Sequence, residues 1–194
     1  MNQNIDQTIE DVFSLYDKFG NDDYIGEPVS QLEHMSQAAQ LAMDGGHPDE
    51  VVLAAFFHDI GHLCASELET ESMNGFGVHR HEAVGGKFLR AKGFPENVAR
   101  LTENHVQAKR YLTFRYPAYF AALSEASKVT LQFQGGQMNA EEAKAFEKDS
   151  LFEYSILLRR WDEQAKEIKV PVMDLEILKA IARRVLIQHQ SSMP

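Results

Sequence analysis

Cysteine is almost absent from this chain of 194 residues, in which Cys64 stands alone. A single cysteine excludes an internal disulfide and the zinc modules that depend on several thiolates. Scarcity of cysteine bridges is typical of reducing compartments. The first residues, MNQNIDQTIEDV, are acidic and lack the basic and apolar regions of a signal peptide. We therefore expect a cytoplasmic protein.

Long apolar runs and positive charge are also scarce. No apolar run approaches the roughly 20 residues that a membrane-spanning helix requires. The 19 basic residues are outnumbered by 29 acidic ones, which leaves a formal net charge of −10. Nucleic acids and anionic membranes bind basic surfaces, so we expect neither as a partner. A small anionic substrate stays compatible if a local cationic pocket opposes the overall charge.

Strand patterns, repeats and linkers are not apparent, whereas helical patterns recur along the chain. Ser30 and Glu33 form a capping box, and Gly45-Gly46, Gly93 and Gly135-Gly136 mark helix ends. We predict an all-α helical bundle in one domain over residues 1–194. The expected helices lie at about 5–18, 30–44, 48–60, 80–92, 95–115, 117–133, 140–148, 151–167 and 174–190.

The stretch FFHDIGH at 56–62 places polar groups at the end of an apolar run. Buried ionisable groups are costly unless they are paired or hold a metal. His58 and His62 are four residues apart and can share a helix face, whereas Asp59 is turned from His58 by about 100°. A carboxylate has two oxygens and can therefore bridge two metal ions, which an imidazole cannot do.

Other polar side chains also fall on inward helix faces. His34 and His105 align with apolar residues, His81 opens a helix, Lys109 lies one turn beyond His105, and Asp162 borders an apolar side. Each of these residues alone is well explained as a hydrogen-bonded filler, a lysine that reaches solvent or a salt-bridged surface carboxylate. Chance burial does not explain four inward histidines together with two aspartates. Nitrogen and oxygen donors without thiolate suit a first-row transition metal such as iron, manganese or zinc.

This ordered set, His34, His58-Asp59, His81, His105 and Asp162, resembles the signature of the HD-domain superfamily over about residues 30–165. Longer strings resemble one branch of it, the PhnZ-like mixed-valent di-iron oxygenases, which cleave the carbon–phosphorus bond of 2-amino-1-hydroxyethylphosphonate or its N-trimethyl analogue. These strings are DYIGE at 23–27, QLEH at 31–34, HDIGH at 58–62, GFGVHRHE at 75–82, HVQAKRYL at 105–112, LSEAS at 123–127, FQGG at 133–136 and RRWDE at 159–163.

The resemblance implies two iron ions, Fe(II) and Fe(III), with O2 as co-substrate. One iron would be held by His34, His58, Asp59 and Asp162. Asp59 would bridge to the second iron, whose ligands are completed by His81 and His105.

The resemblance also implies roles around the metals. Tyr24 would occupy the second iron at rest, and Glu27 would meet the substrate amine when Tyr24 leaves. The phosphonate contacts would come from His62, Lys109, Ser127 and Gln134.

The implied products are phosphate with glycine from the primary amine, or with glycine betaine from (R)-1-hydroxy-2-(trimethylammonio)ethylphosphonate. The resemblance favours the trimethyl form. Aromatic faces for a trimethylammonium are available in Tyr24, Phe76 and Phe133. The C1 hydroxyl of the small phosphonate substrate implies a hydroxylase that acts upstream.

Two other functions stay open. Most HD-domain proteins resemble phosphohydrolases, in which a metal-activated water attacks a phosphate ester. Such an enzyme needs no O2 and gains nothing from Tyr24 or Glu27. A non-catalytic sensor on the same scaffold would bind a metal or ligand tightly without turnover. A requirement for O2 in phosphate release separates the oxygenase from both.

Overall fold

The computed structural model describes residues 4–24, 26–65 and 78–192, and within them it contains helices but no strands, so the all-α prediction is confirmed. One isolated bridge pairs Asp23 with Ser30. The helices are α1 (Ile5–Phe19), α2 (Gln31–Asp44), α3 (Asp49–Phe57), α4 (Ile60–Ala65), α5 (His81–Ala91), α6 (Glu96–Arg115), α7 (Pro117–Ala122), α8 (Glu125–Phe133), α9 (Ala140–Phe146), α10 (Phe152–Gln164) and α11 (Leu175–Ser192).

Three expected helices are wrong in extent: two of them are broken, and the helix expected at 151–167 ends at Gln164. The helix expected at 48–60 ends at Phe57, and α4 starts after Asp59, whose carbonyl accepts the N–H of His62 (2.9 Å). The helix expected at 117–133 is interrupted at Leu123, which is extended. Ser124 then caps α8, because its hydroxyl accepts the N–H of Ser127 (3.2 Å). Both breaks lie beside the pocket described below.

The predicted helix ends are confirmed where local chemistry determines them. Ser30 donates its N–H to the Glu33 carboxylate (2.7 Å) and accepts the Glu33 N–H on its hydroxyl (3.2 Å), which is the capping box expected at the start of α2. Gly46 and Gly93 adopt the left-handed conformation after α2 and α5, where φ is 69° and 79°. A residue with a Cβ would be strained there.

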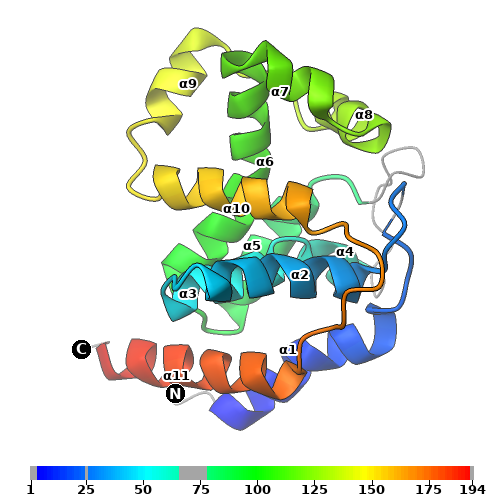
Figure 1. Ribbon diagram of the computed structural model, residues 1–194. Coiled ribbons are helices and arrows are strands. Elements are labelled where there is room, and N and C mark those ends of the chain that lie inside the picture. The colour runs from blue at the N-terminus through cyan, green and yellow to red at the C-terminus, as the bar shows by residue number, and fades with distance from the viewer. Residues whose placement is uncertain (1–3, 25, 66–77, 193–194) are drawn as a thin grey trace.

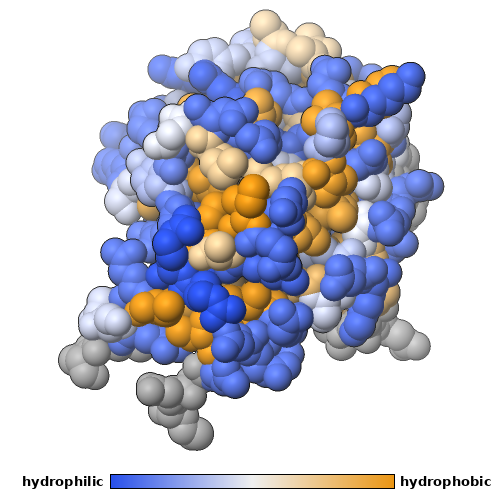
Figure 2. All heavy atoms as spheres, turned by 60° about the horizontal axis from the view of Figure 1, so that its bottom comes forward, coloured by the Kyte–Doolittle hydropathy of each residue, from blue (hydrophilic) through white to orange (hydrophobic). Residues whose placement is uncertain are grey.

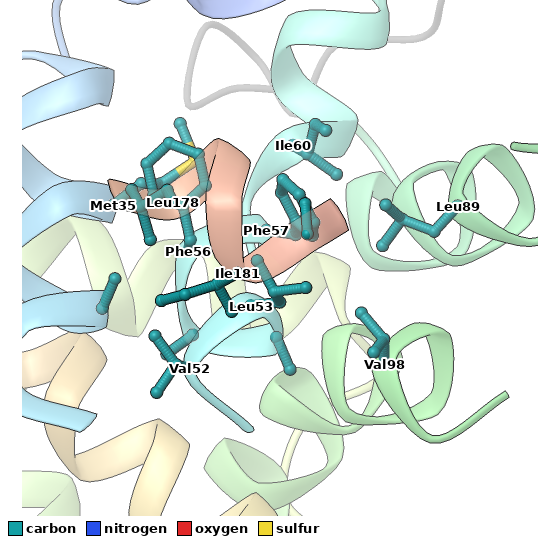
Figure 3. Packing of buried hydrophobic residues seen from close by; sticks show 14 of the residues in the cluster. Met35, Val52, Leu53, Phe56, Phe57, Ile60, Leu89, Val98, Leu178 and Ile181 are labelled. Atoms are coloured by element: carbon teal, nitrogen blue, oxygen red, sulfur yellow. The ribbon is translucent and has the colours of Figure 1, made fainter. Parts of the chain in front are cut away.

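Helix α3 forms the centre of the hydrophobic core. All of its residues from 51 to 57 are buried, and it contacts α2, α6, α10 and α11. Figure 3 shows Leu53, Phe56 and Phe57 of α3 among side chains of α2, α6 and α11, such as Met35, Val98 and Ile181. The ring of Phe56 stacks on Tyr16 of α1, with centroids 4.4 Å apart. The apolar run therefore provides a rigid support for the dyad that follows it.

Helices α4 and α5 approach each other through two glycines. A Cβ on Gly61 would lie 2.7 Å from the carbonyl carbon of His81, and one on Gly85 would lie 3.2 Å from the Gly61 nitrogen. Contacts this close leave no room for a side chain on Gly61. The start of α5, and with it His81, is therefore placed directly against α4.

The arrangement of the remaining helices leaves α10 over the middle of the molecule. Figure 1 shows α10 lying across α2 and α6, with α1 and α11 together at one end and α7, α8 and α9 at the other. The face turned forward in Figure 2, which includes α1 and α11, shows hydrophobic residues interrupted by hydrophilic ones. None of the described helices has the length and apolar character needed to cross a membrane.

Candidate metal centre

Four buried histidines present the same ring nitrogen to the protein backbone. In each, Nδ1 donates to a carbonyl oxygen, which places the proton of the neutral ring on Nδ1 and leaves a lone pair on Nε2. The pairs are His34 with Ala165 (2.8 Å), His58 with Ala55 (2.8 Å), His81 with Val78 (3.4 Å) and His105 with Thr102 (2.6 Å). Backbone carbonyls therefore aim the four Nε2 atoms inward.

The inward Nε2 atoms meet in pairs. Those of His34 and His58 are 3.0 Å apart, and those of His81 and His105 are 3.1 Å apart. Two lone pairs at this distance repel unless a cation lies between them. Burial disfavours a charged ring at His58, but the Asp59 carboxylate outweighs it and raises the His58 pKa to about 9. Burial lowers the pKa of His105 to about 3. The first pair therefore attracts a positive charge, which a metal ion would supply in place of a proton, and His105 of the second pair is neutral.

The carboxylate of Asp59 lies between the two pairs. Its Oδ2 is 3.6 Å from Nε2 of His34 and 3.3 Å from that of His58. Its Oδ1 is 3.2 Å from Nε2 of His81 and 3.4 Å from that of His105. Burial opposes its charge, yet the neighbouring imidazoles, His58 first, hold the Asp59 pKa well below its usual value. Each oxygen thus serves a different pair, as a bridging carboxylate does.

Asp162 adds a sixth donor beside the first pair. Its Oδ1 is 3.5 Å from Nε2 of His34 and 4.0 Å from that of His58, and it is buried without a hydrogen-bond partner among the described residues. The other oxygen accepts a hydrogen bond from the buried guanidinium of Arg159. That guanidinium overcomes the effect of burial and lowers the pKa of Asp162 well below its usual value. The orphaned oxygen is therefore an anionic donor directed at the histidines.

The geometry fits two metal ions. Adjacent ligands of an octahedral ion with bonds of ~2.1 Å lie ~3.0 Å apart, close to the shorter donor distances found here. The structure thus brings together all six residues predicted as metal ligands, in the predicted two sets, and the nitrogen and oxygen donors suit a first-row transition metal.

One pocket opens onto these donors, and its lining includes every residue predicted to contact substrate or act as the gate: Tyr24, Glu27, His62, Lys109, Ser127 and Gln134. Lys109 is buried rather than reaching solvent. Its ammonium donates to Thr130 Oγ1 (2.7 Å) and Gln134 Oε1 (3.0 Å), and burial lowers its pKa to about 7. The structure therefore has the local cationic group that an anionic substrate requires.

His62 differs from the four inward histidines in its tautomer. Its Nδ1 accepts the Val78 N–H (3.2 Å), so the neutral ring carries its proton on Nε2. Burial lowers the His62 pKa to about 3, and the ring stacks on that of His81 with centroids 4.2 Å apart. A ring nitrogen of His62 lies within 4.8 Å of donor atoms of Asp59 and His81. The tautomer nevertheless suits a hydrogen-bond donor better than a metal ligand.

The loop between α1 and α2 carries Tyr24 and Glu27. The ring of Tyr24 stacks on His34, with centroids 4.0 Å apart and planes 14° apart. Burial, with the charges of Asp59 and Asp162, raises the Tyr24 pKa well above its usual value, which keeps the hydroxyl protonated. Glu27 donates its N–H to the Tyr24 carbonyl (2.9 Å), so the two residues belong to one turn.

Sequence reasoning missed two cations of the pocket, Arg159 and Lys166. Arg159 also donates to Tyr119 Oη (3.0 Å) and to Glu163 Oε1 (2.8 Å). Its spacing of three residues before Asp162 was a usable signal, because such residues share a helix face. No local pattern marks Lys166, which follows the end of α10.

The aromatic residues considered for a trimethylammonium group fall in different places. Tyr24 lines the pocket. Phe133 is 36% exposed and is not among the described residues of the lining. Phe76 lies outside the described residues. Tyr24 is therefore the aromatic face that the described part of the chain offers.

This chain is similar to known proteins along most of its length. Residues 31–163 match the model of the HD domain. The chain is 36% identical to the [1-hydroxy-2-(trimethylamino)ethyl]phosphonate dioxygenase (glycine-betaine-forming) of Leisingera caerulea, over 95% of this chain and 93% of that protein. It is 37% identical to the hydroxymethylphosphonate dioxygenase of Gimesia maris, over 88% and 84%. It is also 42% identical to an uncharacterized protein, L432, of Acanthamoeba polyphaga mimivirus, over 98% and 86%.

The HD match covers more than half of the chain, and the two dioxygenases align along most of it. The six donors of the metal centre all lie on the helices or at the helix ends of the matched segment. The chain belongs to the HD-domain family and, within it, to the PhnZ-like oxygenases.

Proposed function

We propose that this protein cleaves the carbon–phosphorus bond of a 1-hydroxy-2-aminoethylphosphonate with O2. Our preferred substrate is (R)-1-hydroxy-2-(trimethylammonio)ethylphosphonate, which would give glycine betaine and phosphate. The alternative is 2-amino-1-hydroxyethylphosphonate, which would give glycine. The observation that carries the proposal is the placement of Asp59 between two facing imidazole pairs, next to a pocket with a buried lysine.

Two iron ions, as Fe(II) and Fe(III), would supply the activation and reduction of O2. The first would be held by His34, His58, Asp59 and Asp162, and the second by His81, His105 and the other oxygen of Asp59. The backbone carbonyls behind the four imidazoles fix their tautomers and orientations, which raises the affinity of such ligands.

The phosphonate would be bound by donors on three helices. Lys109 supplies a positive charge, and Thr130 and Gln134 hold its ammonium in place. The tautomer of His62 offers an Nε2–H, and Ser127 offers a hydroxyl from the first turn of α8. These groups bind the anionic end and orient the C1–P bond toward the metal centre.

The turn that carries Tyr24 and Glu27 would act as the gate. Tyr24 closes the pocket over His34, and Glu27 would accept the cationic end of the substrate once Tyr24 moves away. The gate excludes water until the substrate is bound.

The reaction balances without another reductant. The atoms of a 1-hydroxyphosphonate and of one O2 together make up one carboxylic acid and one phosphate. The electrons that C1 loses are taken up by O2. The C1 hydroxyl must be present beforehand, so a separate hydroxylation supplies the substrate.

The decisive experiment measures phosphate release with ferrous iron, in air and under strict anaerobiosis. The substrates are the two 1-hydroxy-2-aminoethylphosphonates, hydroxymethylphosphonate and a phosphate monoester. Phosphate from a hydroxyphosphonate only in air supports the proposal, and the ratio of kcat/KM between substrates identifies the preferred one. Phosphate from the monoester in both atmospheres would instead establish a phosphohydrolase.

Variants of the gate sharpen the distinction. Tyr24→Phe and Glu27→Ala should change O2-dependent phosphate release, because both residues would act on the hydroxyphosphonate. Unchanged release in both variants would remove the support that the gate gives to the oxygenase.

A further inference from the structure

Lys166 places a cation at the gate. Its Nζ donates to Glu27 Oε1 at 2.6 Å and lies 6.0 Å from the centroid of the Tyr24 ring. The two side chains of the ion pair are 17% and 12% exposed. A charge-assisted hydrogen bond that is mostly sheltered from water is stronger than an exposed pair. Lys166 therefore holds both residues of the proposed gate.

The backbone around Lys166 is fixed to α2 on both sides. The carbonyl of Ala165 accepts His34 Nδ1 (2.8 Å). The side-chain amide of Gln37 donates to the Glu167 carbonyl (2.9 Å) and accepts the Glu167 N–H (3.1 Å). Figure 1 shows this segment, which leaves α10, passing beside the loop that precedes α2. The position of the lysine is thus built into the fold, and the part of it that can move is the side chain.

The Glu27–Lys166 pair lies where two cavities meet. The pocket over the metal donors is lined by Glu27, Ser127 and Lys166, among others. A neighbouring cavity shares these three residues and is also lined by Tyr119 and Glu163. The ion pair is therefore part of a shared wall, and the second cavity provides space beside it for a displaced lysine side chain.

We propose that the ammonium of Lys166 occupies the position of the substrate's cationic group, and that an aminated phosphonate binds by displacing Lys166 from Glu27. This inference rests on the proposed function. A primary ammonium would replace the hydrogen bond to Glu27. A trimethylammonium would replace the positive charge of Lys166 beside the Glu27 carboxylate.

Lys166 thereby determines specificity at the amine end. A phosphonate without an amine leaves the ion pair intact, whereas an aminated one has to break it. Removal of Lys166 leaves the Glu27 carboxylate unpaired, which attracts an ammonium and repels a phosphonate that has none. The preference for aminated ligands should therefore increase when the lysine is lost.

Binding can be measured without turnover. 2-Aminoethylphosphonate and ethylphosphonate differ by one amino group and lack the C1 hydroxyl. Calorimetric titration of the metal-loaded protein without O2 gives the ratio of their Kd values. In Lys166→Met, the preference for 2-aminoethylphosphonate should increase about tenfold, the effect of one charge-assisted hydrogen bond. Lys144→Met removes an equal charge from the exposed surface of α9 and should leave the ratio unchanged.

A double-variant cycle shows whether the effect passes through Glu27. In a Glu27→Gln background, Lys166→Met should not change the ratio. If Lys166→Met folds poorly, Lys166→Gln takes its place, because glutamine is polar but carries no charge. The preference for 2-aminoethylphosphonate should again increase.

Three results would overturn the inference. Unchanged Kd values for both ligands in Lys166→Met and Lys166→Gln would show that Lys166 does not compete with the amine. Equal weakening of both ligands would make Lys166 a phosphonate contact instead. Failure of both ligands to bind the wild-type protein would overturn the inference alone. The proposed function fails only if no hydroxyphosphonate releases phosphate in the presence of O2, so the two failures are distinguishable.

Discussion

Gly61 is the residue whose substitution tests the metal centre most directly without touching a donor. A Cβ on Gly61 would lie 2.7 Å from the backbone carbonyl carbon of His81, whereas ordinary contact begins at 3.4 Å. The two backbones would therefore have to separate by at least 0.7 Å. The obstructing atom belongs to the main chain, so no side-chain rotation can relieve the overlap.

The separation is large compared with the tolerance of metal coordination. His81 Nε2 is 3.1 Å from Nε2 of His105 and 3.2 Å from Asp59 Oδ1, and ligand distances tolerate about 0.2 Å. We expect Gly61→Ala to weaken binding of the second metal by about 10–100-fold. Overpacking should also lower the free energy of unfolding by about 1–3 kcal/mol.

Gly86→Ala is the matched control on α5. Its Cβ would lie 2.6 Å from Cγ and Cδ of Glu103, a side chain that is 30% exposed and would have to turn away from Arg90, with which it forms a part-exposed ion pair. Alanine is favoured over glycine inside a helix by about 1 kcal/mol, which offsets the loss of such a pair, so the free energy of unfolding should change little. Metal analysis and urea unfolding of the two variants provide the test. Two tightly bound metals in Gly61→Ala would refute the argument that α4 positions His81.

Three further predictions address the capping box, the metal ligands and the phosphonate contact. Ser30→Ala should lower the free energy of unfolding by about 1 kcal/mol in urea, with metal content unchanged, because it removes the N-cap of α2. Asp162→Asn should lose one metal per chain in elemental analysis, and retention of both would mean that Asp162 is not a ligand. Lys109→Met should raise KM about 10–100-fold while kcat changes less, since a charged contact acts largely in binding. The control is Lys128→Met, which removes a part-exposed charge from α8 and should leave KM unchanged. Because burial lowers the pKa of Lys109 to about 7, the ammonium is lost as pH rises through 7. Wild-type KM should therefore rise above that pH, and a KM in Lys109→Met with the same pH slope would contradict this origin.

Much of this protein is determined by patterns that act over a few residues. Helical periodicity, the Ser30–Glu33 capping box and the glycines after α2 and α5 predicted the positions of most helices, because hydrogen bonds and steric limits of this kind are local. Inward faces likewise predicted the burial of His34 and His105, whereas the burial of Asp162 and Lys109 was left open. The order of histidines and aspartates along the chain was sufficient by itself to indicate the family.

The tertiary structure alone decided which atoms meet. The His34–His58 and His81–His105 pairs each join residues 24 positions apart, and Lys166 reaches Glu27 across 139. The orientation of Asp59, with one oxygen toward each pair, depends on the helix break that follows Phe57. Periodicity specifies the face on which a side chain lies, whereas the distance between two faces depends on how the helices pack. That packing brings Lys166 to the gate, although nothing near it in the sequence marks it.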